Sequence, residues 1–190
     1  LEFRRVLFRS RVAWVWMLLL AAPLSDLRAQ RVDLPERGST AAGGSAIAEA
    51  IRGMNLHERE DRLVKEILDG NVPTFLRTFT HVDMTVDLEG RRTVVRLEVL
   101  PDVLAVGSDR DFLRIPLSPR AAQVIADRTG TSLPTPKISD AVWASAMLRM
   151  VPQPIPPSEA MTTVPVFTDH QWLIEAAWPD DLARGIAVAG

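Results

Sequence analysis

The chain has 190 residues, of which 47% are hydrophobic and 24% are charged, with a formal net charge of −2 and no cysteine. These totals are typical of one globular domain that buries its own core. They exclude a disulfide scaffold, a thiol enzyme, a cysteine-ligated metal site and a collagen-like or strongly basic chain.

The start of the chain predicts segments that do not belong to a folded domain. Residues 1–10 match the translated end of a common sequencing adaptor, and we expect them to be an artefact. Residues 11–29 hold a base, a short apolar run and a small residue, in the order of a signal peptide. A membrane anchor needs about 20 apolar residues, so we expect export to the periplasm or the outside, without stable membrane insertion after signal cleavage. Residues 30–45 are expected to form a flexible lead, and residues 46–190 a single domain.

The charge balance changes when the predicted signal is left out. Residues 30–190 carry 17 basic and 22 acidic residues, which gives a net charge of −5. Nucleic acids and anionic lipids are bound through clustered positive charge, so we expect no nucleic-acid partner. A cell-wall or extracellular polymer is the partner class that export favours.

The first predicted helix covers residues 56–69, where apolar residues recur at helical spacing. Asn55 can cap its start and Gly70 can end it in the left-handed conformation. A hairpin follows over residues 80–99, because two alternating runs meet at Glu89 and Gly90. A two-residue turn there places acids opposite bases on one face, such as Asp83 opposite Arg96, and apolar residues on the other.

Two further strands are predicted at residues 102–107 and 112–117. Together with the hairpin they would form a four-stranded antiparallel meander packed by helices, so the predicted fold class is α+β. Pro116 should end the last strand or place it at an edge.

Three helices are predicted in the remaining sequence. Ser118 and Pro119 predict a helix to about residue 128 that Gly130 closes. Ser139 predicts a cap for a helix through Met150. Four prolines between residues 152 and 157 predict an extended connector. A capping box at residues 168–171 predicts a last helix that ends before Pro179 and turns four residues inward, namely Trp172, Leu173, Ala176 and Ala177.

Sequence motifs of several enzyme classes are missing from the chain. It holds no Gly-x-Ser-x-Gly, no Ser-x-x-Lys and no glycine-rich phosphate loop, which disfavours those serine hydrolases and nucleotide chemistry. Of the three histidines, His57 is expected on a solvated helix face beside Glu60 and Asp61, His81 opposite Glu98 in the hairpin, and His170 in a helix first turn.

The best local site candidates are Asp109 and Asp111, in the loop of residues 107–111. Two carboxylates on a turn after a strand can hold a divalent cation or act as acid and base. The competing interpretation is that both residues form the turn. No cofactor follows from either interpretation.

The chain resembles a family of exported bacterial proteins of unassigned activity. The similarity lies in residues 107–146 (GSDRDFLRIPLSPRAAQVIADRTGTSLPTPKISDAVWASA) and 161–171 (MTTVPVFTDHQ). In that family the segment matching residues 185–190 continues into a second half rich in His, Tyr, Trp and Asp. The resemblance implies that the domain is truncated here and that the missing half holds the residues best suited to chemistry.

Two functions remain open at this point. The first is the N-terminal part of a cell-envelope or extracellular hydrolase, which would shape a cleft for catalytic groups of the second half. The second is a non-catalytic binding or structural module of the envelope.

Overall fold

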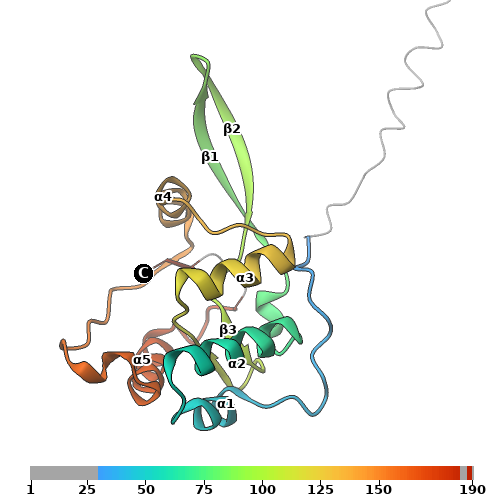
Figure 1. Ribbon diagram of the computed structural model, residues 1–190. Coiled ribbons are helices and arrows are strands. Elements are labelled where there is room, and N and C mark those ends of the chain that lie inside the picture. Colours follow the sequence, from blue (N-terminus) through green and yellow to red (C-terminus); the bar gives the residue numbers. More distant parts are fainter. Residues whose placement is uncertain (1–29, 185–187, 190) are drawn as a thin grey trace, which may run out of the picture.

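The computed structural model describes residues 30–184 and 188–189, so the predicted adaptor and signal segments lie outside the described residues. Figure 1 shows helices combined with antiparallel hairpins, and the predicted α+β fold class is confirmed. Within the described ranges, no helix has the length and apolar character needed to cross a membrane.

The body of the molecule is built from three helices around a short hairpin. Helices α2 and α3 lie side by side, and α1 packs on the hairpin β3–β4 (Figure 1). Apolar side chains from all of these elements meet in one core, where Ile47, Leu63, Val106 and Ile125 are almost fully buried. The bounds are α1 Gly44–Ile51, α2 Leu56–Leu68, β3 Ala105–Gly107, β4 Phe112–Arg114 and α3 Pro119–Thr129.

The ends of α2 and α3 are formed by the residues that the sequence indicated. Asn55 and Glu58 form a reciprocal capping box at the start of α2, and Gly70 follows its end with φ of 80°. The Ser118 hydroxyl accepts a hydrogen bond from the Ala121 amide at the start of α3, and Gly130 ends that helix with φ of 67°. These local signals decide helix ends because they satisfy backbone groups that lack an intrahelical partner.

The segment predicted as a flexible lead is attached to the body instead. The Arg37 guanidinium donates to the Asn71 side chain at 2.8 Å and to the Gly107 carbonyl at 3.2 Å. The Val32 amide donates to the Arg77 carbonyl at 2.9 Å, and helix α1 starts inside the predicted lead. Composition missed this attachment because much of it is made by backbone groups of the segment, which accept from Arg77 at Pro35 and from Asn71 at Ala42.

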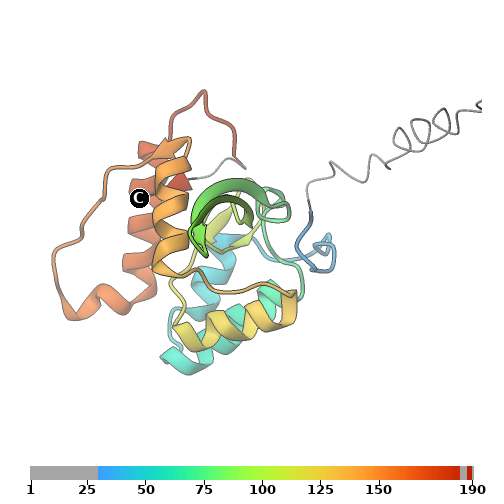
Figure 2. The same cartoon turned by 90° about the horizontal axis from the view of Figure 1, so that it is seen from above.

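The predicted hairpin is confirmed with its register. Strands β1 (Thr80–Leu88) and β2 (Arg91–Val99) pair antiparallel, with Asp83 opposite Arg96 and Leu88 opposite Arg91. Glu89 and Gly90 have φ of 54° and 80°, as a type I′ turn requires. The hairpin projects from the body, and α4 (Pro136–Ser145) packs against its base (Figure 1 and Figure 2).

The predicted four-stranded meander does not form. Among the residues that the structure describes, strands β3 and β4 pair only with each other, and the hairpin β1–β2 is a separate two-stranded sheet. The strands predicted at residues 102–107 and 112–117 are shorter in the structure, with three residues each, 105–107 and 112–114. Buried Pro101 and a bend at residues 101–103 turn the chain away from β2, so the sheet cannot continue.

Helix α4 differs from its prediction at both ends. The Thr135 hydroxyl caps it and Pro136 occupies the first turn, so Ser139 lies inside the helix. The helix ends before Met150, and the Arg149 side chain donates to the carbonyls of Trp143 and Ala144. Strand β5 (Leu148–Arg149) follows and pairs in parallel with β6 (Val188–Ala189).

The last helix also starts earlier than predicted. After the proline-rich connector and a short 3-10 turn, η2 (Glu159–Thr162), helix α5 runs over Val164–Ala177. The predicted capping residue Thr168 lies inside it and donates to the Val164 and Pro165 carbonyls. The predicted end before Pro179 is confirmed.

The predicted inward face of α5 is wrong. Trp172, Leu173, Ala176 and Ala177 are all exposed, and Trp172 keeps 69% of its surface in solvent. The inner face instead carries Val164, Phe167, Gln171 and Ile174. Helical spacing alone does not decide which face is buried; the contacts of α5 with β4 and α1 turn this face inward.

Candidate functional site

The structure places Asp109 and Asp111 in the loop between β3 and β4, but they bind different elements. The Asp109 carboxylate accepts from the Thr74 amide at 2.6 Å and the Thr74 hydroxyl at 2.7 Å. Asp111 accepts from the Ser45 amide and hydroxyl, both at 2.8 Å. Each carboxylate therefore caps the start of a helical segment, η1 (Thr74–Leu76) for Asp109 and α1 for Asp111. The structure does not bring them together as an acid–base pair.

Asp111 lies in a site that only glycine neighbours allow. A Cβ atom on Gly43 would lie 2.1 Å from an Asp111 carboxylate oxygen, and one on Gly44 would lie 2.5 Å from the Phe112 carbonyl carbon. The close packing of α1 against β4 therefore requires glycine at both positions and holds the Asp111 carboxylate at the start of α1. Among the residues that the structure describes, no group of three or more metal-ligating side chains gathers anywhere.

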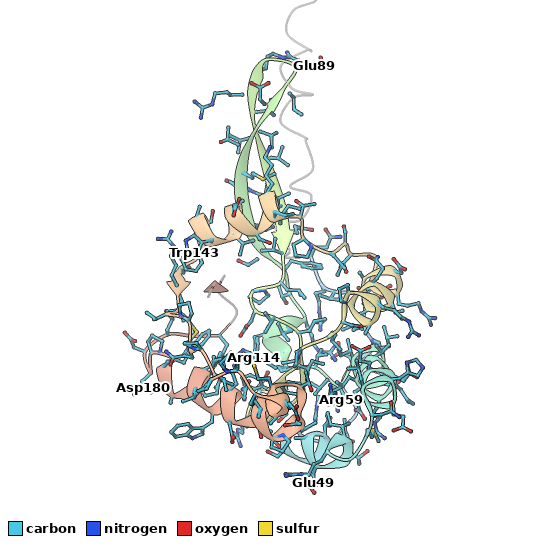
Figure 3. The ribbon with its side chains drawn as sticks, turned by 60° about the vertical axis from the view of Figure 1, so that its left-hand side comes forward. Glu49, Arg59, Glu89, Arg114, Trp143 and Asp180 are labelled. Atoms are coloured by element: carbon cyan, nitrogen blue, oxygen red, sulfur yellow. The ribbon has the colours of Figure 1, made fainter. Side chains whose placement is uncertain are left out.

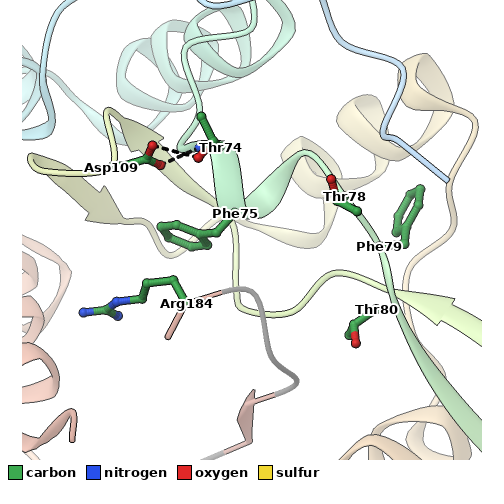
Figure 4. Close-up of a pocket in the computed structure, with 7 residues that line it drawn as sticks. All are labelled: Thr74, Phe75, Thr78, Phe79, Thr80, Asp109 and Arg184. Atoms are coloured by element: carbon green, nitrogen blue, oxygen red, sulfur yellow. Dashed lines mark hydrogen bonds between the residues drawn. The ribbon is translucent and has the colours of Figure 1, made fainter. Parts of the chain in front are cut away.

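Asp109 borders an open hollow of about 370 Å³ beside η1 (Figure 4). Two aromatic rings and three threonines line it together with Asp109 and Arg184; these residues are Thr74, Phe75, Thr78, Phe79 and Thr80. The Phe75 ring is held edge-on by Phe112, with ring centroids 5.2 Å apart. The sequence pattern gave no signal for the hollow, because its two walls are 29 or more residues apart in the chain.

The polar groups of this hollow keep hydrogen-bonding capacity. The Asp109 carboxylate has further lone pairs beyond the two that Thr74 uses. Thr78 and Thr80 are half-buried and bring two further hydroxyl-bearing side chains to the lining of the hollow. The hollow thus combines flat apolar surfaces with acceptors and donors at its edge.

The histidines are spread over the molecule. His57 is exposed, with Nε2 3.4 Å from Asp61, while the neighbouring Glu60 carboxylate accepts from the Ser118 amide at 2.7 Å. His81 faces Glu98 in the hairpin register, as predicted. His170 does not sit in a helix first turn; it is half-buried and lines a second cavity.

A buried charge cluster lies beside that second cavity and centres on Arg114, which is only 8% exposed. Its guanidinium donates to Asp102 at 2.6 and 3.0 Å and to Glu175 at 2.6 Å. Arg184 also pairs with Glu175 and stacks 3.8 Å above the Trp178 ring. Figure 3 shows Arg114 inside the molecule.

Electrostatics keep Arg114 charged despite its burial. Burial by itself lowers the pKa of the guanidinium, but the hydrogen bonds and charges of Asp102 and then Glu175 outweigh it, so the net shift of the pKa is upward. The sequence offered one signal for this cluster, an arginine in the middle of an apolar strand.

The second cavity is a groove of about 650 Å³ between α5, strand β4 and the proline-rich connector. Its lining is mostly apolar and includes Met150, Ile155, Phe167, Ile174 and Trp178. Asp102, Arg114, His170 and Gln171 supply its polar groups. A large apolar cavity with few polar groups is the usual form of a ligand site.

Comparison with protein-family models, curated proteins and solved structures finds no match for this chain.

Proposed function

We propose that the chain is a binding module of an exported envelope protein, which holds the sugar units of a cell-wall or extracellular polymer. The observation that carries this proposal is the composition of the hollow at η1. It joins Phe75 and Phe79 with threonine hydroxyls and the Asp109 carboxylate. Export, predicted from residues 11–29, would bring the module to such polymers.

The chemistry of a sugar ring matches the hollow. A pyranose has apolar C–H faces and a rim of hydroxyls, each of which donates one hydrogen bond and accepts others. The faces suit an aromatic ring, and the rim suits Asp109, Thr78 and Thr80. The hollow is open to solvent, so a polymer chain can reach it.

The acidic balance of residues 30–190 narrows the polymer class. A net charge of −5 disfavours strongly anionic polymers such as nucleic acids, whereas neutral sugar units carry no repulsion. Neutral glycan units are therefore the proposed ligand.

The test is binding of the purified full chain to peptidoglycan sacculi by co-sedimentation and to a soluble N-acetylglucosamine tetramer by calorimetry. We expect Phe79→Ala to weaken binding about tenfold or more, because an aromatic contact contributes a large part of the affinity of a small site. Trp172→Ala is the matched control, since it removes an exposed aromatic ring outside the hollow. Absence of binding by the unmodified chain, or equal binding by both variants, would overturn the proposal.

The second candidate function is the substrate-shaping part of an envelope hydrolase. It is favoured by the groove, because His170 and Asp102 both line it together with the buried Arg114. Release of soluble fragments from the sacculi, with and without chelator, tests it in the same experiment. Turnover that is lost in His170→Gln would favour the hydrolase over the binding module.

A further inference from the structure

We infer that the groove between α5 and the connector binds an uncharged acyl chain. The site is separate from the hollow at η1 and goes beyond the glycan-binding proposal. It is lined by Met150, Val151 and Ile155 on the connector side and by Phe167, Ile174 and Trp178 on the other. Its volume of about 650 Å³ lies in the ordinary range of small-molecule sites.

The charges of the groove argue for an uncharged occupant. Arg114 and Asp102 line the floor, but they are bound to each other at 2.6 and 3.0 Å, and Arg114 also binds Glu175. The second Asp102 carboxylate oxygen accepts from the Val103 amide at 2.7 Å. A charged ligand group would have to break this network, which is costly for a buried pair.

The same count of polar groups favours an acyl chain over a peptide. An extended peptide brings one N–H and one C=O per residue, and each needs a partner when it is buried. On the connector wall Pro152 and Pro154 have no N–H to offer, so only the residues next to them can donate to a peptide backbone. The Gln171 side-chain oxygen already accepts from Arg114. A hydrocarbon chain makes no such demand.

The rim of the groove gives the third argument. Three apolar side chains stand in water at its edges: Val103 is 61% exposed, Val151 76% and Met161 42%. Covering them removes apolar surface from water, which is favourable in proportion to the area. The unbranched methionines Met150 and Met161 can adapt to chains of different length.

The test uses 1-monoacylglycerols of increasing chain length, below their micelle concentration, as competitors of the neutral fluorophore 1-aminoanthracene. With the unmodified full chain we expect the dissociation constant to fall about fourfold for each added methylene until the groove is full. An affinity independent of chain length would overturn the inference. So would displacement of the fluorophore by an apolar extended peptide but by no monoacylglycerol.

Two variants test whether the acyl chain binds in this groove. Ile174→Trp fills the groove and should weaken binding at least tenfold, while Leu173→Trp adds the same ring at an exposed position of the same helix and should leave binding unchanged. If Ile174→Trp fails to fold, Val151→Asp puts a charge on the exposed rim and should also weaken binding. Equal affinities for Leu173→Trp and both groove variants would contradict the site. Phe79→Ala should not affect acyl binding, so failure of the glycan proposal remains distinguishable.

Discussion

Asp83 and Arg96 show how one pair of side chains secures the exposed hairpin. Arg96 donates to both carboxylate oxygens of Asp83, at 2.8 and 3.0 Å. The hydrogen bonding from Arg96 is the main cause that holds the pKa of Asp83 below its ordinary value of 3.8; desolvation opposes it, and the charges of Arg96 and then His81 add to the lowering. Both side chains are exposed, so the pair fixes register and orientation more than it adds stability.

The first prediction concerns the titration of Asp83. The folded pKa is depressed, so the pair stabilises the hairpin above the ordinary pKa, and this contribution disappears as the pH falls through the folded value. Arg96→Gln should raise the pKa of Asp83 toward 3.8, as measured by NMR titration of its carboxyl carbon. Arg92→Gln is the control, because Arg92 lies opposite Asp87. A pKa of Asp83 that stays low without Arg96 would show that another group sets it.

At the scale of elements, the hairpin and helices α2 and α3 form where local signals agree. In the hairpin, apolar and polar residues alternate on either side of a turn with positive φ, and each of the two helices has a capping residue at its start and a glycine after its end. Each of these signals involves residues that are close together in the sequence. A weak point remains at the hairpin tip, where Glu89 has φ of 54°, a conformation that costs a residue with a Cβ atom. Figure 3 shows Glu89 at the far end of the hairpin, away from tertiary support.

The second prediction uses that turn. Glu89→Asn should stabilise the hairpin by about 0.5 to 1 kcal/mol, because asparagine tolerates positive φ and Asn-Gly is the preferred type I′ pair. Hydrogen exchange of the β1 and β2 amides measures the effect locally. Glu89→Gln removes the same charge without the preference of asparagine, and its exchange rates should stay near those of the parent chain. Equal slowing in both variants would instead point to the charge.

At the scale of the whole molecule, helix α5 is joined to the body by polar contacts in addition to the packing of Val164 and Phe167 on the core. Arg114 on β4 binds Glu175 and Gln171 on α5, and Arg59 on α2 donates to the Thr162 carbonyl at 3.0 Å, just before α5. These contacts set the position of α5 and therefore the width of the groove.

The third prediction is that Arg114→Met destabilises the domain by about 3 to 5 kcal/mol, since it leaves the buried Asp102 carboxylate without a cation, while Glu175 keeps its pair with Arg184. Denaturant unfolding measures the loss. Arg110→Met, at an exposed position of the neighbouring loop, should change stability by less than about 0.5 kcal/mol. A loss of under about 1 kcal/mol for Arg114→Met would show that the cluster is not what holds α5 in place.

The candidate site was predictable only in part. The sequence singled out Asp109 and Asp111 because carboxylates on a turn suit both chemistry and capping, and no local pattern separates the two roles. Only the fold showed that Asp111 caps α1 in a packed site while Asp109 caps η1 at the edge of a hollow. The residues that line the two cavities with His170, Phe79 and Arg114 come in part from segments far away in the chain, so local sequence patterns did not indicate these sites.

The sequence by itself determined the hairpin register, two capped helices and the α+β class, because hydrogen bonds and periodicity within one segment specify them. Three features depended on the tertiary structure: the separation of β3–β4 from the hairpin β1–β2, the face of α5 that turns inward, and the position of the cavities. The face of α5 and the cavities depend on contacts between segments that are 29 or more residues apart, such as Arg114 with Glu175, and no local signal encodes such contacts.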